Sequence, residues 1–111
     1  PLGRGFDTFH GGFSGEGHYL EHTTTGGEMY DWHDGDDTDY SVYGEHSQDL
    51  IERYVHQTLD EYDGSAPFFL YVAFHNAHAP MLPKEEFAAL YEDLDVDPRR
   101  KGYLGKLATP L

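Results

Sequence analysis

A continuous apolar run over residues 68–74 is the feature that most constrains how this chain can fold. It follows Pro67 and a turn-forming stretch at 63–65, and it gives way abruptly to polar residues. The run is too short to span a membrane and lacks the polar alternation of a half-exposed strand. Its aromatic and β-branched residues favour a strand covered on both faces, as in a parallel sheet. We therefore predict a buried parallel strand over 68–74.

Polar residues follow this predicted strand directly: His75, Asn76 and His78, with Pro80 after them. Ligands of open α/β sheets bind in the crevice beyond the carboxyl ends of the strands, so these side chains indicate part of a site. The spacing of His75 and His78 could chelate zinc, but no helix is predicted here to hold both on one face. For these two histidines we favour contact with an anionic substrate, followed by a structural role and then by a zinc-binding pair.

The length and charge of the chain limit its class. With 111 residues it is at most one small domain, and a single buried strand needs neighbours, so it reads as a segment of a larger fold. Its formal charge is −14, from 21 acidic and 7 basic residues, which disfavours nucleic acid and anionic membranes as partners. The absence of cysteine excludes a disulfide, a thiolate metal site and a cysteine nucleophile within these residues.

Helices are predicted on both sides of the apolar run. The first starts at Ser47, a good N-cap, ends near Tyr62 and carries one apolar stripe; its members are Leu50, Ile51, Tyr54, Val55 and Leu59. A second starts at Pro83, with Phe87, Leu90 and Tyr91 on one side. Residues 93–98 are predicted as an acidic linker ended by a proline, and residues 102–111 as the start of a third helix.

The first half of the chain is predicted to be mostly glycine-rich loop. Residues 28–32 and 40–43 are typical of a small hairpin with its turn at 34–37. The acidic run 31–39 does not match an EF-hand, because neither register places glycine sixth and glutamate twelfth. We interpret it as a solvated acidic turn.

Several residue types in these loops suggest chemistry and have simpler interpretations. Six of the eight histidines lie outside the 75–78 segment without a common spacing, and a solvated surface histidine is favoured for each over a metal ligand. Arg4 and Asp7 could line an active-site rim, but hydrogen bonds to the loop backbone or to each other are favoured. Tyr19, Tyr30 and Tyr40 could stack on a sugar, although partial burial over the hairpin is favoured.

Three stretches together resemble the sulfatase family, and within it the arylsulfatase B-like enzymes. They are segment 1–9, containing Arg4-Gly5-Phe6-Asp7; Tyr43 leading into the first predicted helix; and 67–74 followed by His78-Ala79-Pro80. Their order and spacing cover nearly the whole chain. The last stretch is the most specific of the three.

The resemblance implies an α/β fold, in which residues 1–111 are an internal segment of an alkaline-phosphatase-like sandwich with a largely parallel central sheet. It implies hydrolysis of an aryl sulfate or a sulfated glycan by a formylglycine nucleophile with bound Ca²⁺, both supplied from outside this chain. His78 matches the family's sulfate-contacting histidine and is the expected substrate-binding residue. No catalytic residue and no metal ligand are expected here, so the chain alone is expected to be inactive.

Other properties implied by the resemblance are less specific. Family members are mostly exported or lysosomal. His75 stands where many relatives carry an uncharged polar residue, and its role is open. Two alternatives are an acidic, histidine-rich module that binds divalent cations and a catalytically inactive sulfatase-like protein that serves in recognition. A Cys-x-Pro-x-Arg motif upstream and an Asp-Asn pair downstream would favour the active enzyme.

Overall fold

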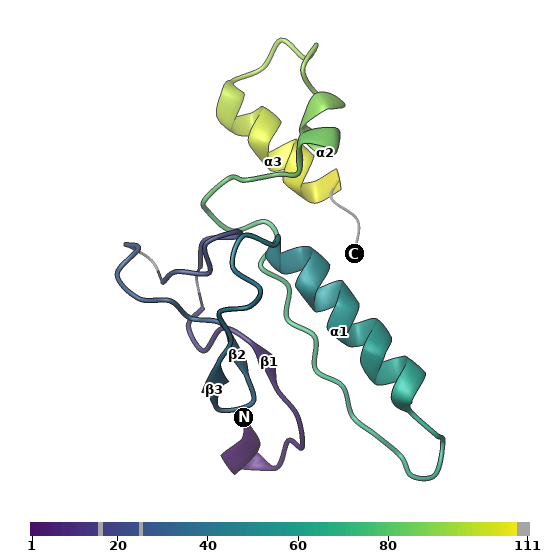
Figure 1. The fold of residues 1–111 in the computed structure, drawn as a ribbon. Helices are drawn as coiled ribbons and strands as arrows, with labels where there is room; N and C mark the ends of the chain where they lie inside the picture. Colours follow the sequence, from purple (N-terminus) through teal and green to yellow (C-terminus); the bar gives the residue numbers. More distant parts are fainter. Residues whose placement is uncertain (16, 25, 109–111) are drawn as a thin grey trace. The chain divides into compact units, whose positions relative to one another are not determined.

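The computed structural model describes residues 1–15, 17–24 and 26–108, with side chains described as far as Gly105. Two compact units make up the chain, Pro1–Phe74 and His75–Leu111 (Figure 1).

A small antiparallel sheet lies in the first unit, with strand order β1-β2-β3. The strands are β1 (His10–Gly11), β2 (His33–Asp34) and β3 (Asp37–Thr38), and a short 3₁₀ helix, η1 (Leu2–Arg4), precedes them. In the register, His10 pairs with Asp34, and Asp34 pairs with Asp37. The turn between β2 and β3 contains Gly35 at φ +63°, a conformation that glycine adopts at little cost. The turn lies where it was predicted, whereas the paired strands are shorter and closer to it than 28–32 and 40–43.

The helix α1 (Ser47–Glu61) forms as predicted and ends within one residue of Tyr62. Its first half contributes Leu50, which is completely buried, to a core with Trp32 and Val42, and Ile51 and Tyr54 pack against this core. Towards the end of α1 the apolar stripe is open to solvent, because Leu59 is 48% exposed.

The N-cap of α1 is His46, and the prediction of Ser47 was wrong by one residue. His46 has extended backbone angles (φ −72°, ψ 129°), and its ring nitrogen Nδ1 accepts a hydrogen bond from Gln48 N at 3.2 Å. This bond satisfies one of the backbone amides that the first turn of a helix leaves without an internal partner. Ser47 is the first helical residue and is fully buried.

The apolar run 68–74 forms no strand in the part of the chain that the structure describes. After α1 the chain turns back as an extended segment (Figure 1). Phe69 and Tyr71 are 76% and 71% exposed, so the predicted burial on both faces is absent. A strand requires a neighbour to pair its amides and carbonyls, and no described residue makes such a pair with this segment. The largely parallel sheet therefore stays a prediction.

The second unit contains α2 (Glu85–Ala89) and α3 (Pro98–Ala108). Gly105 allows close packing between them, since a Cβ added there would lie 3.2 Å from Ala88 Cα and 3.1 Å from Pro83 Cβ. The prediction that this helix starts at Pro83 was wrong by two residues, because α2 begins at Glu85 after the N-cap Lys84. The helix also ends at Ala89, so Leu90 and Tyr91 of the predicted stripe lie beyond it, and Leu90 is 69% exposed.

The third helix begins earlier than predicted, at Pro98. We expected this proline to end an acidic linker, but a residue without an amide proton fits the first turn of a helix, where amides have no internal partner. The Asp97 carboxylate accepts a hydrogen bond from Arg99 N at 2.8 Å, so one amide of the first turn has a partner. Among the residues described, no helix is long and apolar enough to cross a membrane.

Candidate functional site

His78, the predicted substrate contact, lies in an exposed turn at the start of the second unit. Its amide donates to the carbonyl of His75 at 2.8 Å, which closes the turn. Its ring nitrogen Nδ1 lies 2.9 Å from Ala79 O. A carbonyl can only accept, so Nδ1 carries the proton and donates to it. The other nitrogen, Nε2, then becomes a donor only when the ring is protonated.

The tautomer of His78 decides what the ring can offer an anion. A neutral ring with its proton on Nδ1 presents a lone pair at Nε2, which a sulfate oxygen would repel. A protonated ring presents an N–H and a positive charge, and charge-assisted hydrogen bonds of this kind are the stronger ones. His78 is therefore suited to contact a sulfate group as the imidazolium.

His75 and Asn76 are half-buried in the same turn, in contrast to exposed His78. The structure thus brings the three predicted residues into one short loop, with cis peptide bonds at Asn76–Ala77 and Ala79–Pro80. Of the two histidines, His78 is the more exposed to solvent.

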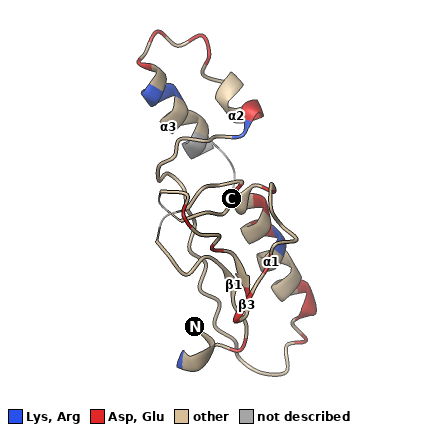
Figure 2. Cartoon of the chain, turned by 60° about the vertical axis from the view of Figure 1, so that its left-hand side comes forward, with Lys and Arg blue, Asp and Glu red and all other residues tan. Residues whose placement is uncertain are grey.

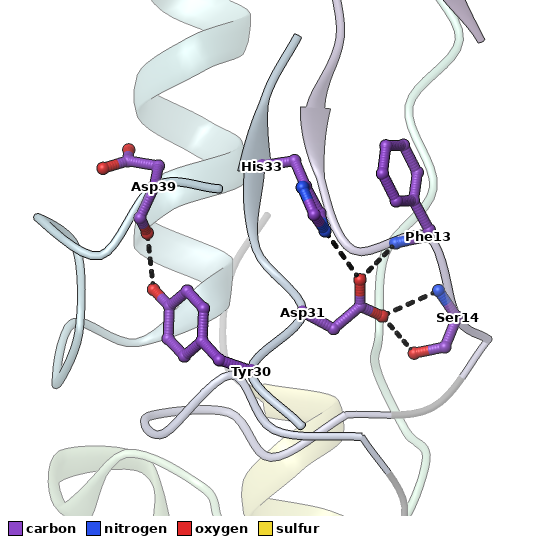
Figure 3. Close-up of polar contacts among 6 residues, drawn as sticks. All are labelled: Phe13, Ser14, Tyr30, Asp31, His33 and Asp39. Carbon is purple, nitrogen blue, oxygen red and sulfur yellow. Dashed lines mark hydrogen bonds and ion pairs between the residues drawn. The ribbon is translucent and has the colours of Figure 1, made fainter. Parts of the chain in front are cut away.

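Asp31 was predicted to belong to a solvated acidic turn, but its side chain is only 12% exposed and organises the first glycine-rich loop (Figure 3). It accepts hydrogen bonds from Phe13 N at 2.9 Å, from Ser14 N at 2.8 Å and from the Ser14 hydroxyl. The fourth partner is His33 Nε2, at 3.1 Å, and the Phe13 ring stacks on the His33 imidazole with centroids 4.1 Å apart.

The hydrogen bonds around Asp31 determine its protonation. Partial burial by itself raises the pKa of this carboxyl, but the bonds from Ser14, Phe13 and His33 favour the ionised form and outweigh it, so the pKa is lowered. Gly12 completes the arrangement, since a Cβ there would come 3.0 Å from Asp31 O. The spacing of 17 residues between Ser14 and Asp31 gives no local sequence signal for this contact.

Most of the histidines predicted to be solvated have defined structural contacts instead. His22 is buried, with Nε2 3.1 Å from Val42 O, and its ring packs against Trp32. His10 stacks on Tyr54 and lies 3.2 Å from Asp34. His18 Nδ1 accepts from Glu21 N at 3.0 Å. Of the six, His56 fits the prediction best, with a side chain 70% exposed.

The other candidates from the sequence are not brought together. Arg4 ends η1 and is exposed, as is Asp7. Tyr19 is completely buried and cannot stack on a ligand, whereas Tyr40 is 67% exposed. Among the described residues, no group of three or more His, Asp or Glu side chains is arranged to hold a metal ion.

Comparison with curated proteins relates nearly all of this chain to a sulfatase, which confirms the family recognised from its motifs. The relative is arylsulfatase J of Mus musculus, which is 32% identical over 115 residues. The match covers 97% of this chain but 19% of the relative, so the chain spans about a fifth of that protein's length. No protein-family model matches the chain.

Proposed function

We propose that this chain acts within a longer sulfate-ester hydrolase and supplies one substrate contact, His78. The observation that carries this proposal is the match to a sulfatase along 97% of the chain. His78 belongs to the stretch that most resembles the family, and its ring is exposed in a turn closed by a backbone hydrogen bond. The substrate class is a sulfated small molecule or glycan.

The family's calcium ion and formylglycine do not fit the residues of this chain. Formylglycine is made from a cysteine, and the chain has none. The described residues include no group arranged to hold a metal ion. We propose that both groups are supplied from outside these residues, and we assign no step of the reaction to them here.

Electrostatics define the part that His78 would take. A sulfate ester is an anion, and a chain of formal charge −14 repels it unless cations are focused at the site. Protonated His78 would place one positive charge and an Nε2–H donor in the turn. Such a donor stabilises the reaction to the extent that its hydrogen bond strengthens as charge develops on the sulfate oxygens.

For the longer protein we propose the corresponding fold, an α/β sandwich with a largely parallel sheet, to which the extended segment 68–74 would contribute a strand. Its aromatic side chains are exposed although the sequence is typical of a buried strand. We propose that neighbouring strands of the longer protein pair with this segment, which would fix the start of the His78 turn at the carboxyl edge of the sheet.

The test is the turnover of a fluorogenic aryl sulfate by the longer protein, with the matching phosphate ester as the control substrate. We expect hydrolysis of the sulfate ester by the longer protein and none by the 111-residue chain, which lacks the cysteine from which a formylglycine nucleophile is made. A folded longer protein that binds the aryl sulfate without hydrolysing it would instead establish the inactive, sulfatase-like alternative.

A further inference from the structure

Two Asp-Gly pairs in this chain carry the same chemistry, Asp34–Gly35 and Asp63–Gly64. In such a pair the amide nitrogen of the glycine can attack Cγ of the preceding aspartate side chain. Because glycine has no Cβ, its amide is less hindered than that of other residues. The two pairs lie in different surroundings, so the structure indicates which of them is free to react.

The reaction is a ring closure followed by a hydrolysis. The glycine nitrogen forms a bond to Cγ, and the hydroxyl of the protonated carboxyl group leaves as water with the amide proton, which gives a five-membered succinimide. One water then adds to either carbonyl carbon of the ring and breaks its bond to the nitrogen. Opening at the side-chain carbonyl restores aspartate. Opening at the main-chain carbonyl gives isoaspartate, in which the backbone runs through the side-chain methylene.

The amide of the first pair is already engaged, although the Asp34 side chain is 64% exposed. Gly35 N donates to Phe9 O at 2.7 Å. Asp34 is also paired on both sides within the small sheet, with His10 of β1 and Asp37 of β3. Attack on Cγ requires the Gly35 amide to leave its carbonyl partner and the backbone to rotate, and the sheet opposes both changes.

The second pair lies in an exposed turn between α1 and the extended segment 68–74 (Figure 1). No described residue accepts a hydrogen bond from Gly64 N. Gly64 has φ +76°, and a Cβ added there would meet no atom beyond its chain neighbours within 4 Å, so the turn has room to rearrange. Asp63 Oδ1 accepts from Ser65 N at 2.8 Å, which holds the carboxyl group over the backbone that follows it, on the side of the Gly64 amide.

We propose that Asp63 is a site of spontaneous isoaspartate formation, and that Asp34, followed by the same residue, is protected by the sheet. The product would lengthen the turn between α1 and the extended segment by one methylene group. Hydrogen bonds from Ser65 lower the pKa of Asp63, so the protonated carboxyl is scarce at neutral pH and ring closure is faster in mild acid. This modification goes beyond ester hydrolysis and does not depend on it.

The experiment is incubation of the longer protein at neutral pH and physiological temperature, followed by peptide mapping. Mass spectrometry with electron-transfer fragmentation distinguishes isoaspartate from aspartate at each pair. We expect isoaspartate to form at Asp63 about tenfold faster than at Asp34, the rate ratio that one net backbone hydrogen bond can impose. The same incubation in concentrated urea frees both amides and should bring the two rates close together.

Two variants at the same position test the chemistry. Asp63→Glu should not react, because its longer side chain would need a six-membered ring, which forms more slowly. Asp63→Asn should react faster than the parent, because ammonia leaves an amide more readily than water leaves a carboxylate. The proposal is wrong if the folded protein forms isoaspartate at Asp34 as fast as at Asp63. It is also wrong if Asp63 stays intact in the folded protein for as long as urea takes to convert both pairs.

Discussion

Asp31 joins segments of the first unit that are far apart in the sequence. Its carboxylate holds Phe13 and Ser14 of the glycine-rich loop while the same residue precedes Trp32 of the core and bonds to His33 of β2. Hydrogen bonds to a charged group contribute more than neutral ones, typically about 1.5–3 kcal/mol. At the scale of single residues, Asp31 is therefore expected to be a main determinant of stability.

Asp31→Asn should lower the free energy of unfolding by about 1.5–3 kcal/mol at neutral pH, because the amide loses the charge that strengthens these bonds. The lowered pKa of Asp31 means that its stabilisation is present above the ordinary Asp pKa of 3.8 and is lost as the pH falls through the lower, folded value. Urea unfolding followed by Trp32 fluorescence, at neutral and acidic pH, measures both effects. The control is Asp36→Asn, at an exposed residue of the β2–β3 turn. Equal stabilities for the two variants would contradict the role of Asp31.

Tyr30 should make stability sensitive to alkaline pH. Burial, together with the nearby charge of Asp39, raises the pKa of Tyr30 from 10.0 to about 12. A raised folded pKa means that the stabilisation is complete below pH 10 and is lost as the pH rises from 10 towards 12. Tyr30→Phe removes the titrating hydroxyl, so the part of the alkaline loss caused by Tyr30 should disappear. Unfolding curves at pH 9 and pH 11 for parent and variant test this, and identical pH dependence would count against it.

At the scale of elements, local signals were predictable and non-local pairing was not. The α1 helix and the turn at Gly35 follow from periodicity and glycine placement, and both confirm their predictions. β1 was missed because a two-residue strand gives no alternating pattern, and its partner β2 lies more than 20 residues away. Of the candidate site, the sequence indicated a polar segment with His75, Asn76 and His78, whose role as a site stays a prediction, and it gave no sign of the Asp31 contacts. Those contacts depend on tertiary packing that spacing does not encode.

The cap at His46 provides a test at the N-terminus of α1. Removing a capping side chain costs about 0.5–2 kcal/mol. His46→Ala should therefore destabilise the first unit by that amount, while His46→Asn should retain most of the stability because asparagine also accepts from the second amide of a helix. Urea unfolding of both variants at pH 7 is the measurement. If alanine and asparagine are equally destabilising, capping by His46 is not the cause.

The extended segment 68–74 provides a second test at this scale. Without a partner strand, its amides should exchange with deuterium nearly as fast as those of an unstructured peptide in the 111-residue chain. In the longer protein the same amides should be protected by pairing within the proposed sheet. Hydrogen exchange followed by mass spectrometry compares the two proteins, with peptides from α1 as the internal reference. Protection of 68–74 in the short chain would show that it does not need an external partner.

At the scale of the whole molecule, charge is divided unequally between the two units. Pro1–Phe74 contains 15 acidic and two basic residues, whereas His75–Leu111 contains six acidic and five basic residues. Three of the basic residues are consecutive at the start of α3, Arg99, Arg100 and Lys101 (Figure 2). His78 therefore belongs to the unit that repels an anion less. On charge alone, we expect an anion to approach the second unit more readily than the first.

The most direct test of the central claim is the kinetics of His78→Ala in the longer protein with an aryl sulfate. Loss of one donor to the transition state should lower kcat/KM by on the order of 10²–10³. His56→Ala, at an exposed histidine of α1, is the matched control and should leave kcat/KM unchanged, and His75→Ala should have a smaller effect than His78→Ala. Circular dichroism measures the folded fraction of each variant, so that kcat/KM values are compared at equal concentrations of folded protein. A large loss of kcat/KM in folded His78→Ala is the predicted result, and full activity, or loss only through unfolding, would contradict the account.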